Sequence, residues 1–335
     1  MRVFVLGSVF PDSFTRNVLE SLHQMGHEVD TFSSWRAPFW VPYRLRLLLN
    51  LAARSAGLDR PRPSLRRKLR RFEPDLVLNC YEDIEPALVA ELRRRTRAVL
   101  VAWFPDVLVN LGRQYLLAAP YHALFFKDRS MVRFAREKLD RPAFFLPECC
   151  NPAWHRPQEL TADERAFYGC DLTTAASMYY YRALLLELFA DYDLKIWGRG
   201  YPPWLPSRLR PAYQNHFVAE QEKAKAFGAA KIVLNTIHYG EIEGVNARLF
   251  EAAGCGAFQI CEYREALREF FEPETEVVTF RTREELKEKV DYYLARPTER
   301  RAIAERACAR AHREHTYQHR LRCLLRTVEE VRSGP

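Results

Sequence analysis

The sequence predicts an α/β protein made of two Rossmann-like domains, each with a doubly wound parallel sheet. The chain has 335 residues, which is more than one domain usually holds. A strand, helix, strand pattern opens the chain at Val3, and the same pattern starts again at Asp171. Between Lys231 and Ile260 the sequence again reads strand, loop, helix, strand. Such units build parallel sheets, because parallel strands need a crossover connection.

The first half of the chain opens with an apolar strand from Val3 to Leu6, followed by a loop, an amphipathic helix that ends at Gly26, and a strand over 27–32. The loop lacks the G-x-G-x-x-G fingerprint of dinucleotide-binding domains. Further along, AVLVAWFPD predicts a strand that is followed by Asp106. Because ligands bind at the carboxyl ends of parallel strands, Asp106 is a candidate base for an acceptor hydroxyl. The alternative is a simple turn residue.

The second half restarts with a strand over 171–175, a helix over 178–189 and a strand that ends at Trp197. The turn Gly198-Arg199-Gly200 closes this unit. An arginine at a strand end can reach a diphosphate, which its planar guanidinium binds through two hydrogen bonds.

The segment IEGVNARLFEAAGCGAFQI, residues 242–260, is the most informative part of the sequence. Gly244 precedes a predicted helix, and Asn246 is the expected N-cap. The free N–H groups and the dipole at such a helix start attract phosphate. Glu243 and Glu251 stand on either side with seven residues between them, which suits a ligand with both phosphate and hydroxyl groups. A sugar nucleotide is such a ligand, although a chance pair of glutamates is the alternative.

Composition indicates an ordinary globular protein, with 48% hydrophobic and 28% charged residues and a net charge of +8. No apolar run is long enough to span a bilayer. The eight cysteines include no C-x-x-C pair, so we expect reduced thiols and no zinc site. We expect a cytoplasmic protein with an anionic partner.

The stretch 40–71 combines aromatic and leucine residues with a basic cluster at 66–71. A basic amphipathic helix of this kind can contact an anionic membrane, peripherally on the inner face, or hold a lipid-linked acceptor. The interpretation that we favour is a core-packing helix with a solvated basic face. We do not expect nucleic-acid binding, because no recognisable reading motif accompanies the charge.

The string NTIHYGEIEGVNARLFEAAGCGAFQI, residues 235–260, resembles the donor-binding segment of group 1 glycosyltransferases. Its N-x-R-x-F-E-x-x-x-C-G-A-F pattern resembles the CgeB-like branch in particular. The resemblance implies the GT-B fold, with two Rossmann-like domains that face a central cleft. It implies an acceptor-side domain over 1–160, a nucleotide-sugar donor domain over 161–312, and a helix over 313–335 that crosses back to the first domain.

The resemblance also assigns roles to residues. It makes Glu243, Asp12 and Asp106 the catalytic candidates, where Asp12 lies in the first loop of the acceptor side. The donor-binding candidates are Ser177, Arg182, Gly198, Arg199, Gly244, Val245, Asn246, Arg248 and Glu251. Arginines would neutralise the diphosphate, and no D-x-D pair suited to a divalent ion is present, so we expect neither a metal nor a cofactor.

These expectations combine into a hexosyltransferase-type enzyme that moves a sugar from a nucleoside-diphosphate sugar to a hydroxyl acceptor, which could be a glycan, a lipid-linked sugar or a small molecule. Retention of configuration follows from the resemblance. Two alternatives are a sugar-nucleotide epimerase on the same fold and a non-catalytic nucleotide-sugar or polyanion-binding protein.

Overall fold

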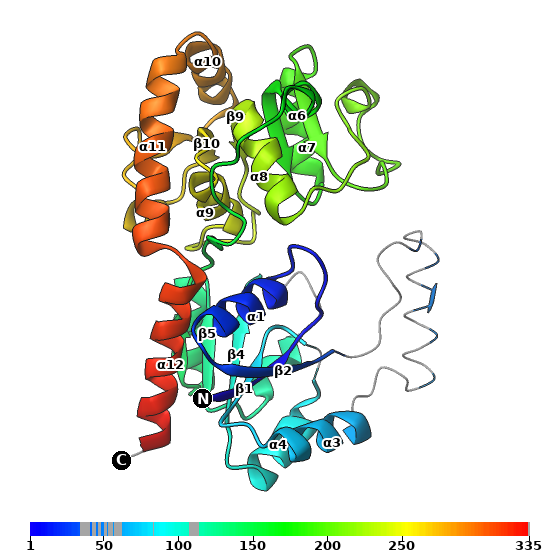
Figure 1. Ribbon diagram of the computed structural model, residues 1–335, viewed down its shortest axis with the longest axis vertical. Coiled ribbons are helices and arrows are strands. Elements are labelled where there is room, and N and C mark those ends of the chain that lie inside the picture. The colour runs from blue at the N-terminus through cyan, green and yellow to red at the C-terminus, as the bar shows by residue number, and fades with distance from the viewer. Residues whose placement is uncertain are drawn as a thin grey trace. The chain divides into compact units, whose positions relative to one another are not determined.

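The computed structural model describes residues 1–33, 62–82, 84–106 and 114–333, together with positions 41, 45, 48, 49, 52 and 56. The chain forms two compact units (Figure 1). Unit 1 comprises Met1–Pro147, Gly240–Ile242 and Tyr317–Pro335, and unit 2 comprises Glu148–Tyr239 and Glu243–Thr316. The domain limits expected at 160/161 and 312/313 stay a prediction.

Unit 1 contains a parallel sheet of six strands in the order β2-β1-β3-β4-β5-β6. The chain runs from β1 outward to β2 and then returns to β3 on the other side of β1, which is the arrangement of a doubly wound sheet. Its strands are β1 (Arg2–Leu6), β2 (Glu28–Phe32), β3 (Leu76–Asn79), β4 (Val99–Phe104), β5 (Ala123–Phe126) and β6 (Ala143–Phe145).

Helices cover both faces of this sheet. Buried leucine and valine side chains of α3, α4 and α5 share one core with alternate side chains of the strands, such as Phe4 and Phe104. Helices α1 and α12 lie together and contact the sheet at β1 and β4. The bounds are α1 (Phe14–Gln24), α3 (Arg62–Phe72), α4 (Pro86–Arg95), η2 (Gln114–Ala118), α5 (Arg129–Leu139) and α12 (Tyr317–Ser333).

Three aromatic rings join α1, α12 and the sheet. The ring of Phe14, the first residue of α1, meets the indole of Trp103 edge to face with centroids 4.7 Å apart. Tyr317, the first residue of α12, lies 5.9 Å from Phe14 and 6.2 Å from Trp103. The indole N–H of Trp103, which is fully buried, donates to the Leu146 carbonyl at 3.0 Å. This contact holds the last helix on the sheet of unit 1.

Unit 2 contains a second parallel sheet, of five strands in the order β11-β10-β9-β7-β8. The chain runs from β7 outward to β8 and then crosses to β9 on the other side of β7. The strand order therefore reverses between β7 and β9, and this switch point is where doubly wound sheets bind ligands. The strands are β7 (Cys170–Ala175), β8 (Leu194–Trp197), β9 (Ala230–Asn235), β10 (Gln259–Glu262) and β11 (Val278–Phe280).

In the described part of the chain, side-chain caps begin three helices of unit 2, namely α6, α9 and α10, whereas α7, α8 and α11 begin without one. Thr161 and Glu164 form a capping box on α6, and Thr282 caps α10. The bounds are α6 (Ala162–Tyr168), α7 (Tyr180–Leu186), η3 (Glu187–Phe189), η4 (Ser207–Leu209), α8 (Glu220–Ala229), α9 (Ala247–Gly254), η5 (Glu265–Glu269), α10 (Arg283–Leu294) and α11 (Pro297–Glu314). The two parallel sheets confirm the predicted fold class of doubly wound α/β units.

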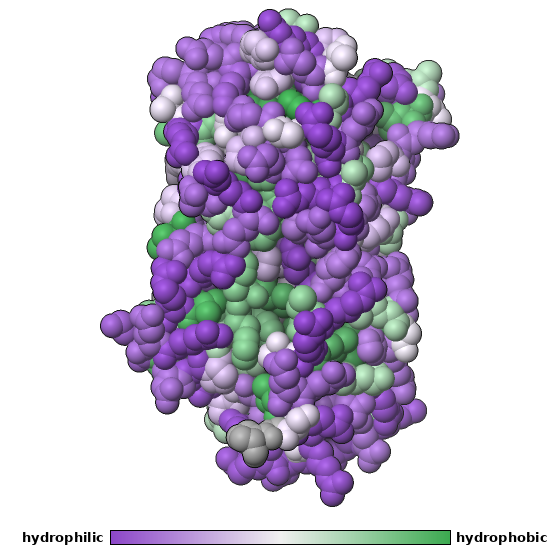
Figure 2. Space-filling model, turned by 90° about the vertical axis from the view of Figure 1, so that its left-hand side faces the viewer, coloured by the Kyte–Doolittle hydropathy of each residue, from purple (hydrophilic) through white to green (hydrophobic). Residues whose placement is uncertain are grey.

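No helix in the described part of the chain is long and apolar enough to cross a membrane. Hydrophilic side chains dominate the face shown in Figure 2, which fits the large share of charged residues in the sequence. Of the basic stretch 40–71, most positions before 62 lie outside the described residues, whereas 62–71 form α3.

We expect Trp103→Ala to lower the free energy of unfolding of unit 1 by about 3–5 kcal/mol, because it empties the space of a fully buried indole. Urea unfolding measures the loss, and hydrogen exchange of peptides from each unit locates it. Phe134→Ala is the control, since this ring is 45% exposed and its loss should cost only about 0.5 kcal/mol or less. Equal costs for the two variants would contradict the role given to Trp103.

Candidate functional site

The switch point of unit 2 brings together two loops and a helix start, which we call the β7–β9 site. It consists of residues 175–179 after β7, residues 236–239 and 243–246 after β9, and the first turn of α9, all of which belong to unit 2. Two arginines, one from each side, link these segments.

Arg182, on α7, ties the β7 side to the loop after β9. Its side chain is buried, with 4% exposed. Nε donates to the hydroxyl of Thr236 at 2.6 Å, and Nη2 donates to the Thr236 carbonyl at 3.2 Å. Nη1 donates to the carbonyl of Ser177. Arg182 therefore fixes the loop that precedes Glu243.

Arg248, on α9, makes the reciprocal link. Its Nε donates to the Ala175 carbonyl at the end of β7 at 3.2 Å, and its Nη1 donates to the side-chain oxygen of Asn235 at 3.1 Å. Burial first, and then the positive charge of Arg182, lower the pKa of Arg248 to about 10, while the charge of Glu251 opposes the shift. Arg248 is still charged at neutral pH. Two guanidinium groups repel each other here, and a bound anion would relieve that repulsion.

Asn246 is the N-cap of α9, as predicted. Its side-chain oxygen accepts the N–H of Leu249 at 3.2 Å, and its amide donates to the Asn235 side chain at 2.8 Å and to the Thr236 carbonyl at 3.0 Å. One side chain thus caps the helix and fixes the loop before it. The N–H groups of the first turn then point toward the loop. Gly244 and Val245 are buried in this loop, and Glu243 is half-buried.

Glu251 lies in a network that the sequence did not reveal. One carboxylate oxygen is 2.8 Å from Nζ of Lys223 on α8, and the other is 3.8 Å from Nε2 of His155. Nδ1 of His155 accepts the N–H of Asn151 at 3.0 Å, which leaves Nε2 facing Glu251. Lys223 therefore holds the carboxylate in place, and the ring of His155 lies beside it. Lys223 gave no signal in the sequence, since it is one charge among several on a short helix.

The two glycines of the turn after β8 have conformational reasons. A Cβ on Gly198 would lie 2.5 Å from the hydroxyl of Tyr213, and Gly200 has φ of +72°. Arg199 is exposed in this turn after β8, one strand further from β9 than Arg182. At Gly254, near the end of α9, a Cβ would lie 3.1 Å from the Cβ of Cys150 and 3.0 Å from the His155 carbonyl oxygen.

The tripeptide Asp191-Tyr192-Asp193 has the spacing of a D-x-D motif, but its place does not suit the β7–β9 site. It precedes β8, at the amino end of the strand, whereas the site lies at the carboxyl ends. Asp191 is bonded to Arg208 at 2.9 Å. Two histidines near the end of α11 also have partners inside unit 2. Nε2 of His312 faces the carbonyl oxygen of Gly254, and Nε2 of His315 faces that of Phe270.

Residues 181–326, which include Arg182, the loop after β9 and α9, match the family model described as "Glycosyl transferase-like". The chain is a glycosyltransferase. No curated protein sequence matches it.

Solved structures share the fold of this glycosyltransferase. Sucrose-phosphate synthase from Thermosynechococcus elongatus is similar at a TM-score of 0.69 and 13% identity, over 100% of both chains. HepE from Anabaena, in complex with UDP and glucose, is similar at a TM-score of 0.64 and 12% identity, over 98% of this chain and 100% of the HepE chain. WaaG, a glycosyltransferase involved in lipopolysaccharide biosynthesis, is similar at a TM-score of 0.61 and 14% identity, over 96% of this chain and 98% of the WaaG chain.

These neighbours identify the fold as GT-B, as the resemblance implied. They also support the likeness to group 1 glycosyltransferases, while the CgeB-like branch stays a prediction.

Two of the catalytic candidates of the glycosyltransferase lie in unit 1 and one in unit 2. Asp12 is half-buried, directly before the α1 cap Ser13, with φ of 66°. Asp106 is exposed two residues after β4. Strand β3 separates β1 from β4 in the sheet, so the structure does not place the two aspartates on neighbouring strands. Glu243 belongs to unit 2.

The predictions from sequence did not include a group of aromatic side chains at the β7–β9 site. The hydroxyl of Tyr181 donates to the Ile237 carbonyl at 2.7 Å, and its ring lies edge-on to the rings of His238 and Tyr239. Burial raises the pKa of Tyr181, so it keeps its proton and its role as donor. Tyr179 stacks on Tyr181 with centroids 6.1 Å apart. The run of three tyrosines at 179–181 was the signal in the sequence.

Lys223→Met should destabilise unit 2 by about 3–5 kcal/mol, because it leaves the carboxylate of Glu251 without its buried partner. Chemical denaturation of the variant measures this cost. The double variant Lys223→Met with Glu251→Gln should recover most of the loss, since no unpaired charge remains.

Lys225→Met, two residues along the same helix, is the matched control. Its pair with Glu164 is 29% exposed on each side, so we expect a loss of about 1 kcal/mol or less. If the two lysine variants cost the same, Glu251 does not depend on Lys223.

Proposed function

We propose that this glycosyltransferase transfers a sugar from a nucleoside-diphosphate sugar to a hydroxyl acceptor, with retention of anomeric configuration and without a metal ion or other cofactor. The acceptor would be a glycan, a lipid-linked sugar or a small molecule. The observation that carries the proposal is the pair of guanidinium groups at the capped start of α9, at the switch point of unit 2.

The donor capacity of the site supports a diphosphate. Among the described residues, Nη2 of Arg248 has no hydrogen-bond partner, whereas Nε and Nη1 are held by Ala175 and Asn235. The side chain is thus fixed through two of its nitrogens and offers the third. Arginine is well suited to phosphate because its donors match the spacing of the oxygens. A preorganised donor of this kind stabilises charge that develops on a leaving diphosphate.

The two glutamates would handle the sugar and the ribose. We assign the ribose hydroxyls to Glu251, whose carboxylate is oriented by Lys223 and lies beside the ring of His155. Glu243, in the loop that Arg182 holds through Thr236, would contact the transferred sugar. HepE of Anabaena, solved with UDP and glucose, suggests a UDP sugar as the first donor to try.

Arg248→Lys should weaken binding of the correct nucleoside diphosphate by about 10-fold to 150-fold, the equivalent of one charge-assisted hydrogen bond of about 1.5–3 kcal/mol. Titration calorimetry with UDP, GDP, dTDP and CDP sugars measures the change and identifies the base. The nucleoside without phosphates should bind the variant and the wild type equally, because it does not need the guanidinium.

Arg300→Lys provides a matched arginine control. Arg300 lies in the same unit and donates to the backbone carbonyls of Tyr293 and Leu294, away from the β7–β9 site. Its replacement should leave nucleotide binding unchanged. Failure of all four nucleotide sugars to bind the folded wild type would contradict the proposed donor site.

Retention of configuration predicts that neither Asp12→Asn nor Asp106→Asn removes a general base. We expect each variant to keep its activity within about tenfold, whereas loss of a true base costs about 100-fold to 10,000-fold. Proton NMR of the first-formed product shows whether the anomeric configuration of the donor is kept. An inverted product, together with the larger loss in one variant, would overturn retention. The same spectra show whether an epimerised nucleotide sugar forms without transfer.

A further inference from the structure

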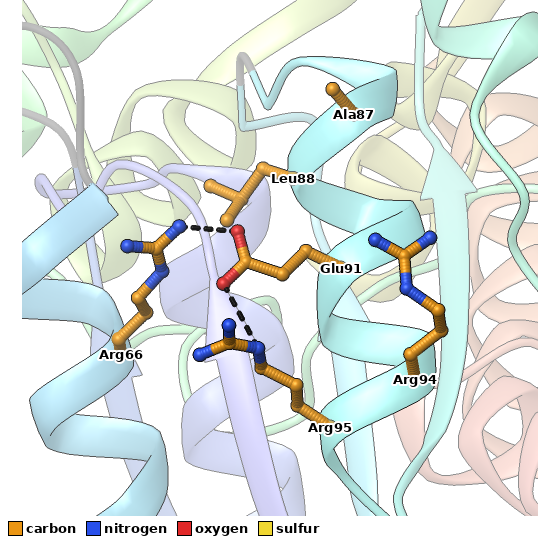
Figure 3. Close-up of a pocket in the computed structure, with 6 residues that line it drawn as sticks. All are labelled: Arg66, Ala87, Leu88, Glu91, Arg94 and Arg95. Atoms are coloured by element: carbon orange, nitrogen blue, oxygen red, sulfur yellow. Dashed lines mark hydrogen bonds and ion pairs between the residues drawn. The ribbon is translucent and has the colours of Figure 1, made fainter.

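Unit 1 has a charged pocket between α3 and α4. The pocket of about 350 Å³ is lined by Arg66 from α3 and by side chains of α4 (Figure 3). This volume is near the lower end of small-molecule sites, which span about 300–1,000 Å³. The lining residues are Arg66, Ala87, Leu88, Glu91, Arg94 and Arg95.

The charges of this pocket do not balance. Glu91 accepts from Arg66 and pairs with Nε of Arg95 at 3.4 Å, and Figure 3 shows Arg94 unjoined to that carboxylate. Three cations against one carboxylate leave an excess of two positive charges. Among the described residues, Arg94 has no ion-pair partner, and the buried Nε of Arg66 has no hydrogen-bond partner. An arrangement of like charges with unused donors is stabilised by an anion.

The surroundings extend the positive field. Further exposed basic side chains lie on the same two helices: Arg67, Arg70, Arg71 and Arg93. Lys68 of α3 is exposed too, but it pairs with Asp30 at 3.7 Å. A positive field of this size attracts an anion that carries several charges more strongly than it attracts a single carboxylate. Guanidinium groups bind phosphate oxygens through paired N–H donors.

The pocket is separate from the acceptor-side loops of unit 1. Helix α4 begins after β3 at the carboxyl edge of the sheet and runs back to the amino edge, where β4 begins. Arg94 and Arg95, at its last residues, therefore lie toward the amino edge. Asp12 and Asp106 follow the carboxyl ends of β1 and β4.

We propose that the pocket of Arg66, Arg94 and Arg95 is a second anion site, which binds a phosphate-bearing group outside the reaction. The group belongs either to a free phosphate compound or to the headgroup of an anionic lipid. In both cases it anchors unit 1 by its phosphate and takes no part in sugar transfer.

The test is arginine modification by phenylglyoxal, read residue by residue by mass spectrometry on the full chain. At a pyrophosphate concentration about ten times its Kd, the modification of Arg94 and Arg95 should slow about tenfold, because only about a tenth of the pockets stay empty. Arg322 and Arg326, exposed on α12 of the same unit, are the internal reference and should react at an unchanged rate. A second anion at the β7–β9 site does not disturb this local measurement.

Vesicles of phosphatidylcholine, with and without phosphatidic acid, form the second arm. Protection by free pyrophosphate indicates a soluble ligand, and protection by phosphatidic acid vesicles alone indicates a headgroup; either result supports the site. In a vesicle or pyrophosphate binding assay, Arg94→Gln with Arg95→Gln should lose the interaction, while Arg322→Gln with Arg326→Gln removes the same charge and should keep it.

Three results would overturn the proposal. The first is an unchanged modification rate of Arg94 and Arg95 in both arms. The second is equal protection of Arg322 and Arg326, which would indicate unspecific attraction to a basic protein. The third is protection by an oligonucleotide but by neither phosphate probe.

Discussion

The reciprocal arginine links between β7 and β9 are the interaction on which the β7–β9 site depends. Arg182 belongs to α7, which follows β7, and it donates to the loop after β9. Arg248 belongs to α9, which follows β9, and it donates to the end of β7. Arg182 is buried and Arg248 is half-buried, and taking a charge out of water costs free energy that hydrogen-bond partners must offset. The lowered pKa of Arg248 reflects this burial and the neighbouring charge of Arg182. The proposed diphosphate would relieve the repulsion between the two guanidinium groups.

The same site shows how a loop becomes a rigid element. Thr236, Asn246 and Glu251 all have partners within unit 2, so the segment that carries Glu243 is held at both ends. Asn246 is central, because it satisfies the first turn of α9 and also bonds to Asn235 at the end of β9. Fixed side chains lower the ordering cost when a ligand binds.

The sequence predicted the local features of this site and missed the tertiary ones. The strands, the helix after residue 246 and its Asn246 cap follow from apolar patterns and capping preferences, which act over a few residues. Lys223 and His155 are 28 and 96 positions away from Glu251, and no local pattern connects them to it. In the same way, the sequence places Arg66 and Glu91 in two separate basic segments, although the fold brings them together in one pocket. Propensity describes elements, whereas pairing depends on how the elements pack.

The aromatic contact of Tyr317 has a consequence for how the chain is made. The ribosome completes all of unit 2, whose last residue is Thr316, before it adds α12 to unit 1. Until then, the sheet of unit 1 lacks the helix that covers Phe14 and Trp103. The first unit to be translated is therefore the last to be finished, and its uncovered rings are a place where a nascent chain can meet a chaperone or another copy of itself.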